Sequence, residues 1–170
     1  MKYIALLVRA FRNALLSPPD GRLFQRALLN YVLAISGSLA LVGIAAGVLT
    51  LLGIPLEELS APDMKINLRD FLGAVVIAPV FETLLLAGML ALMPLRWGIA
   101  RRAIISAIVW GLLHGVFAPL WFFGSVFGFF VFSCGYMVWR QKSFAYGFAA
   151  ASIPHAIINL TVFVITAISE

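Results

Sequence analysis

The sequence has few charged residues and one cysteine, and these shortages exclude a water-soluble domain and an intrachain disulfide. Charged side chains make up 11% of the 170 residues and apolar side chains 63%, and the mean hydropathy is +1.06. A water-soluble domain carries about 25% charged residues, so this composition excludes one and indicates an integral membrane protein. The single cysteine, Cys134, excludes an intrachain disulfide.

The net charge of +5 does not indicate a nucleic-acid partner, because the basic residues lie in short segments between apolar stretches. That placement indicates membrane topology and contact with anionic lipid headgroups. Ten of the 12 Lys and Arg fall within 1–27, 94–102 and 140–142. The positive-inside rule then predicts a cytoplasmic N-terminus and an outside C-terminus, in a compact chain typical of a bacterial inner (plasma) membrane.

Long apolar stretches predict the fold class. A helix needs about 20 apolar residues to cross a bilayer, and five stretches approach or reach that length: 28–53, 71–93, 103–118, 120–139 and 143–168. We therefore expect an all-α fold in which 28–168 form a polytopic transmembrane helix bundle.

The N-terminal residues 1–19 separate apolar from basic side chains in a helical pattern. We expect them to form an amphipathic interfacial helix that ends at Pro18 and Pro19, with an apolar face of Ile4, Leu7, Val8, Phe11 and Leu15. A basic tail that only sets the topology is an alternative interpretation of the same residues.

Ionisable side chains within the apolar stretches are rare and mark the candidate site. They are Glu82, His114 and His155, and Asn159 follows His155 by one helical turn. Burying such a group in a membrane costs roughly 3 kcal/mol or more, so these groups indicate function. All three ionisable groups fall at similar depths, which allows three helices to bring them into one pocket.

This set of side chains suits attack by water on an acyl group. A carboxylate can act as general base, histidines can orient water or transfer protons, and an amide can stabilise an oxyanion. Glu82, His114 and His155 could also hold one divalent metal such as Zn, although no H-E-x-x-H pair is present. A proton or cation pathway and a purely structural hydrogen-bond network are the alternatives.

Three short motifs resemble those of the CAAX prenyl protease and bacteriocin-processing (CPBP/Abi) family of intramembrane proteases. They are A-P-V-F-E-T-L-L-L-A-G at 78–88, W-G-L-L-H-G at 110–115 and H-A-I-I-N at 155–159. The resemblance implies an intramembrane endopeptidase with a membrane-embedded or lipidated peptide or protein as substrate. It implies Glu82 as general base, His114 and His155 as its helpers and Asn159 as an oxyanion donor.

Two positions depart from the family pattern. Thr83 stands where that family has a second Glu, and Ala87 where it has an Arg. The departures keep open a second function, a membrane binding or immunity protein that has lost catalysis and uses the same polar pocket.

Aromatic residues crowd the stretch 120–139. We expect most of them to face lipid, with Trp121 and Trp139 at the membrane interfaces; a wall against an apolar substrate is the alternative.

Overall fold

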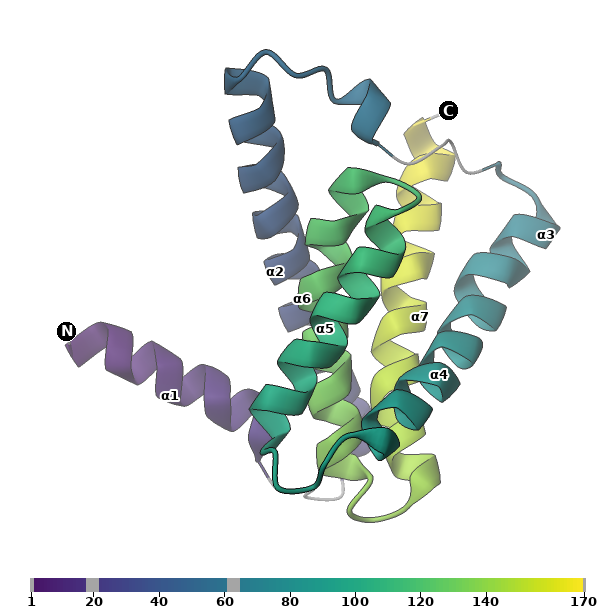
Figure 1. Ribbon diagram of the computed structural model, residues 1–170. Coiled ribbons are helices and arrows are strands. Elements are labelled where there is room, and N and C mark those ends of the chain that lie inside the picture. The colour runs from purple at the N-terminus through teal and green to yellow at the C-terminus, as the bar shows by residue number, and fades with distance from the viewer. Residues whose placement is uncertain (1, 18–21, 61–64, 170) are drawn as a thin grey trace.

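The computed structural model of the chain describes residues 2–17, 22–60 and 65–169. Every regular element in these ranges is a helix, which confirms the all-α prediction (Figure 1). In chain order they are α1 Lys2–Leu16, α2 Leu23–Leu51, η1 Glu57–Leu59, α3 Leu68–Phe71, the π-helix η2 Leu72–Ile77, α4 Ala78–Leu92, α5 Ile99–Gly115, α6 Pro119–Trp139 and α7 Phe144–Ser169.

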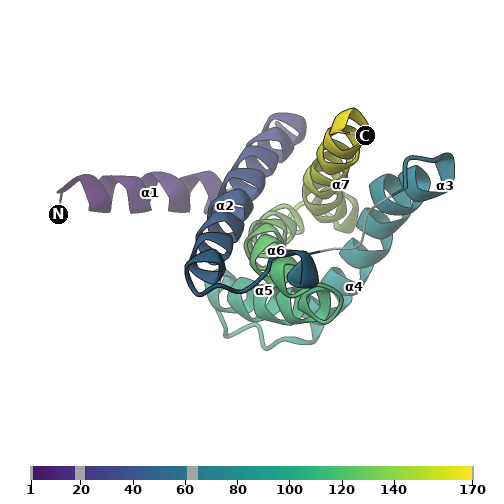
Figure 2. The ribbon, with the colours of Figure 1, turned by 90° about the horizontal axis from the view of Figure 1, so that it is seen from above.

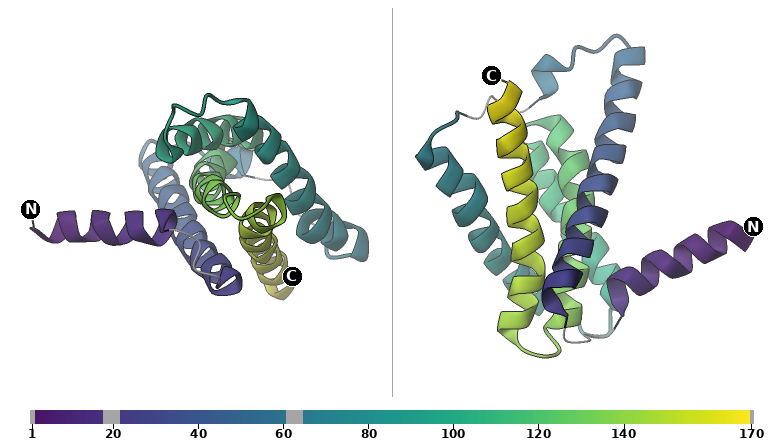
Figure 3. Two further views of the ribbon diagram at one scale, coloured as in Figure 1. Left: turned by 90° about the horizontal axis from the view of Figure 1, so that it is seen from below. Right: turned by 180° about the vertical axis from the view of Figure 1, so that it is seen from behind.

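Five helical segments run between the two ends of a bundle. The α4–α5 and α6–α7 connections lie at the end of the bundle where α2 begins, and the C-terminal end of α7 lies at the opposite end (Figures 1 and 3). Four segments are long and apolar enough to cross a membrane: α2, the continuous stretch Leu68–Leu92, α6 and α7. The transmembrane helix bundle predicted from the sequence is therefore present.

The fifth expected span is a shorter helix than the others. Helix α5 has 17 residues, or about 25 Å, and Arg101 and Arg102 lie in its first turn. It begins at Ile99 rather than at 103, and Pro119, which lies between the expected stretches 103–118 and 120–139, starts α6. Gly111 and Gly115 allow α5 to pack tightly on α6, because an added Cβ at either would lie 3.1 Å from the Phe122 side chain.

Helix α1 extends sideways from the bundle, and its C-terminal end is fixed to it (Figure 2). Leu15 is 5% exposed in the core, the Phe11 ring contacts that of Phe127 at 6.3 Å, and Arg26 donates to the Ala14 carbonyl at 2.8 Å. Arg9 and Arg12 are exposed. The rest of the predicted apolar face lies outside the described side chains, at Ile4, Leu7 and Val8. The predicted helix end at Pro18 and Pro19 lies outside the described residues. The division into an interfacial helix and a bundle stays a prediction.

Helix α6 forms the centre of the bundle, between α2, α5 and α7 (Figure 2). Every residue from 131 to 139 is buried, and Trp139 is 1% exposed. The expectation that most aromatic residues of this stretch face lipid is wrong for Phe129, Phe132, Tyr136 and Trp139, which are 1–6% exposed. Composition could not show this, because an aromatic helix suits both lipid and a protein core.

Candidate active site

The segment that carries Glu82 has an irregular backbone. Residues Leu72–Ile77 form a π-helix, which passes into α4 at Ala78, with Pro79 in the first turn of α4. Short π-helical segments within α-helices frequently occur at functional sites. Glu82 follows one turn after Pro79, so its side chain leaves the helix just beyond this irregularity.

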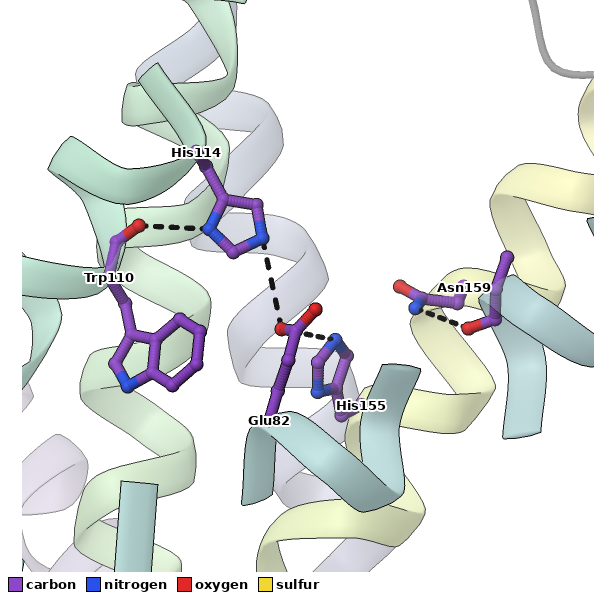
Figure 4. A network of polar contacts seen from close by, with 6 residues as sticks. Glu82, Trp110, His114, His155 and Asn159 are labelled. Atoms are coloured by element: carbon purple, nitrogen blue, oxygen red, sulfur yellow. Dashed lines mark hydrogen bonds and ion pairs between the residues drawn. The ribbon is translucent and has the colours of Figure 1, made fainter. Parts of the chain in front are cut away.

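The carboxylate of Glu82 lies between the two histidines (Figure 4). Its Oε2 atom is 3.8 Å from Nε2 of His114 and 3.8 Å from Nε2 of His155. Oε2 is buried and has no hydrogen-bond partner within the described part of the chain. The structure thus brings together three of the four predicted site residues from α4, α5 and α7, and leaves a carboxylate oxygen facing two imidazole nitrogens.

The ring of His114 is oriented by its own helix. Its Nδ1 lies 2.9 Å from the carbonyl oxygen of Trp110, one turn earlier on α5. A carbonyl can only accept a hydrogen bond, so Nδ1 carries a proton, and Nε2 is the ring atom directed at Glu82. Fixing the tautomer in this way defines which atom of His114 can exchange a proton at the site.

Two buried phenylalanines of α6 hold the histidine rings. Phe132 stacks on His155 with ring centres 5.0 Å apart, and Phe129 contacts both His155, at 5.4 Å, and His114, at 5.3 Å. Both are 3% exposed. Nothing in the sequence distinguishes these two residues from the other aromatic residues of α6, so their role could not be predicted.

Asn159 shares a face of α7 with His155 but makes a different contact. Its Nδ2 donates to the carbonyl oxygen of Ala74, in the π-helix, at 2.7 Å, and Figure 4 shows this bond to one side of the Glu82 cluster. The fourth predicted residue therefore lies against the segment that leads to Glu82.

The two positions that depart from the family pattern are buried on α4. The residue Thr83 is 2% exposed and Ala87 is 5% exposed. An isolated charge at either position would be strongly destabilising, whereas a hydroxyl and a methyl group are not. Because both positions are buried, loss of only the Glu or only the Arg would leave the other charge without a partner, which explains why the two are absent together.

The donors at the site suit a metal chemically, because zinc binds carboxylate oxygen and imidazole nitrogen. Within the described residues, however, no three His, Cys, Asp or Glu side chains are grouped closely enough to hold an ion. A divalent metal held by Glu82, His114 and His155 therefore stays a prediction.

Comparison with known proteins identifies the family. A family model described as "Type II CAAX prenyl endopeptidase Rce1-like" matches residues 65–161. Neither a curated protein nor a solved structure matches the chain. The matched region is more than half of the chain and contains Glu82, His114, His155 and Asn159. With four helices able to span a bilayer, this integral membrane protein belongs to the Rce1-like family of type II CAAX prenyl endopeptidases.

Proposed function

We propose that this protein is an intramembrane endopeptidase that hydrolyses a peptide bond of a membrane-associated protein or peptide, with Glu82 as the general base. The observation that carries the proposal is the position of the Glu82 Oε2 atom, 3.8 Å from an imidazole nitrogen on each side. A carboxylate without a hydrogen-bond partner beside two imidazoles suits the activation of a water molecule.

In the proposed reaction, water donates a proton to Glu82 as its oxygen forms a bond to the scissile carbonyl carbon. In the neutral tautomer of His114 that donates from Nδ1 to the Trp110 carbonyl, the Nε2 atom accepts a hydrogen bond from that water. The C–N bond of the tetrahedral intermediate then breaks, and Glu82 returns the proton to the leaving nitrogen. The products are a new carboxyl terminus and a new amino terminus, and the carboxylate of Glu82 is restored.

The oxyanion of the tetrahedral intermediate needs hydrogen-bond donors. We assign this role to His155, in the tautomer protonated on Nε2, and to the second N–H of the Asn159 amide. The Nδ2 of an asparagine carries two hydrogens, so the bond to Ala74 leaves one of them available.

The surroundings of the site suit a substrate that arrives from the membrane. The side chains of Glu82 and His114 are 23% and 24% exposed, and that of His155 is 8% exposed. The neighbours of Glu82 on the outer face of α4 are apolar and exposed, with Phe81 at 63% and Leu85 at 56%. A substrate with a lipid anchor or an apolar segment is compatible with this surface, and we place the protein in a bacterial inner membrane with a cytoplasmic N-terminus.

No step of the proposed mechanism runs through a metal. The proposed steps use only the side chains of Glu82, His114, His155 and Asn159, so we expect activity to survive dialysis against a chelator. Loss of activity on chelation, with recovery on addition of zinc, would require the side chains to close around an ion.

Cleavage of a farnesylated peptide in proteoliposomes tests the proposed base. Replacing Glu82 by Gln keeps the shape and removes the base, and we expect kcat to fall by about 10²- to 10⁴-fold. Glu58→Gln is the matched control, because Glu58 is exposed in η1 and should leave kcat unchanged. Equal activity of the two variants would refute the assignment of Glu82.

The departures at Thr83 and Ala87 favour a second candidate, a membrane protein that binds such a peptide without cutting it. The same peptide assay distinguishes binding from cleavage. A binding protein retains the intact peptide on both wild type and Glu82→Gln and releases no product from either.

A further inference from the structure

The π-helix and Pro79 together leave one backbone carbonyl without a donor. The N–H of Ala78, which would serve Ala74 in a regular α-helix, donates instead to Gly73. The next N–H in the π-helical register would come from residue 79, and proline has none. The Ala74 carbonyl is therefore left without either of the backbone donors that the helix could supply.

The side chain of Asn159 supplies the missing donor from α7. Its Nδ2 lies 2.7 Å from the Ala74 oxygen, within the range of a good N–H···O hydrogen bond. A partly buried carbonyl without a partner is destabilising in any protein, and more so where lipid replaces water. This bond therefore joins α7 to the irregular segment at the point where that segment cannot complete its own hydrogen bonds.

The bond belongs to a series of contacts that align α7 with the chain leading to Glu82. The rings of Phe71 and Phe163 meet edge to face at 5.3 Å, Asn159 follows at Ala74, and His155 then lies 3.8 Å from Glu82. From one contact to the next, the residue numbers rise along 71–82 and fall along α7, so these two segments run antiparallel. Ala74 precedes Glu82 by eight residues, or about 12 Å along the helix, on one continuous helical segment.

We propose that Asn159 is a positioning residue, whose amide holds the carbonyl that Pro79 leaves without a donor and so fixes Glu82 against His155. The inference rests on the proposed function for the role of Glu82 and adds a second role for Asn159 besides that of oxyanion donor. It assigns the π-helix and Pro79 a role: they leave a carbonyl that, among the described residues, accepts its hydrogen bond from the Asn159 amide of α7.

A double-mutant cycle tests the inference, because Pro79→Ala restores an N–H that can serve the carbonyl. Asn159→Leu should speed amide hydrogen exchange in 72–84 at least tenfold, a change that corresponds to about 1.4 kcal/mol. Adding Pro79→Ala should bring exchange back to within threefold of wild type. Thr161→Val is the control, since it removes the hydrogen bonds of the Thr161 hydroxyl to Tyr31 on α2 and to the Ile157 carbonyl within α7. Neither involves 72–84, so this segment should be unchanged.

Activity on the farnesylated peptide provides the second measurement. Asn159→Leu should lower kcat with little change in KM, and adding Pro79→Ala should recover at least tenfold of the lost kcat. Recovery of exchange without recovery of kcat would overturn the positioning role, as would equal exchange in both backgrounds. If Asn159→Leu does not fold, Asn159→Ala serves in the same cycle. Exchange does not depend on catalysis, so failure of Glu82 as the base would leave the exchange result readable.

Discussion

Replacement of Phe129 by Leu tests whether α6 holds the two histidines in place. The Phe129 ring contacts four other rings: Trp110 at 4.5 Å, His114 at 5.3 Å, His155 at 5.4 Å and Phe132 at 5.6 Å. Aromatic contacts contribute about 0.5–1.5 kcal/mol each, so the variant should lose about 2 kcal/mol or more of unfolding free energy. Both histidines also lose a shared neighbour, and a displacement of about 1 Å at reacting groups can cost about 10²-fold in rate.

The matched control is Phe127→Leu, two residues earlier on α6. The ring of Phe127 contacts only Phe11 and Phe130 among the described rings, so about 1 kcal/mol should be lost and kcat should stay within threefold of wild type. Unfolding by denaturant titration in mixed micelles and cleavage of the farnesylated peptide give the two numbers. Equal losses of kcat in both variants, or a Phe129→Leu enzyme with wild-type kcat, would refute the account of α6.

Two further predictions concern buried positions. An added Cβ at Gly135 would lie 2.7 Å from Nδ2 of Asn30 and 3.1 Å from the backbone carbonyl of Ala150, so Gly135→Ala should lower the free energy of unfolding by about 1–3 kcal/mol. Gly43→Ala is the control and should be nearly neutral, because an added Cβ there meets nothing within 4 Å. Similar losses for the two variants would contradict the packing at Gly135. Ala87→Arg should destabilise by about 3 kcal/mol or more, with partial rescue by Thr83→Glu in the double variant; additive losses would show that the two positions do not interact.

Much of the fold could be predicted from hydropathy and charge. The bundle, four of its spans and the convergence of Glu82, His114 and His155 follow from apolar length and from the rarity of ionisable groups inside it. Ionisable groups are retained inside a membrane where they have partners, so three such groups at similar depth are expected to lie close to one another. The rarity of these groups predicts which residues meet, but it does not predict which of their atoms face each other.

Backbone detail and the packing of α6 could not be predicted. The π-helix at Leu72–Ile77 arises from a local choice of hydrogen-bond register, and no sequence pattern distinguishes it from an α-helix. Asn159 was expected at the oxyanion because of its motif, and its bond to Ala74 depends on that register. The burial of Phe129 and Phe132 depends on which face of α6 meets α5 and α7, which an aromatic stretch does not reveal.

The most direct test of the central claim is a comparison of protein termini in membranes of cells that make the wild-type chain or Glu82→Gln at equal levels. The account predicts new N-termini and C-termini that occur only with the wild-type chain, from membrane-associated proteins. Identical sets of termini, with both chains folded and inserted, would contradict proteolysis by this protein and favour the binding function.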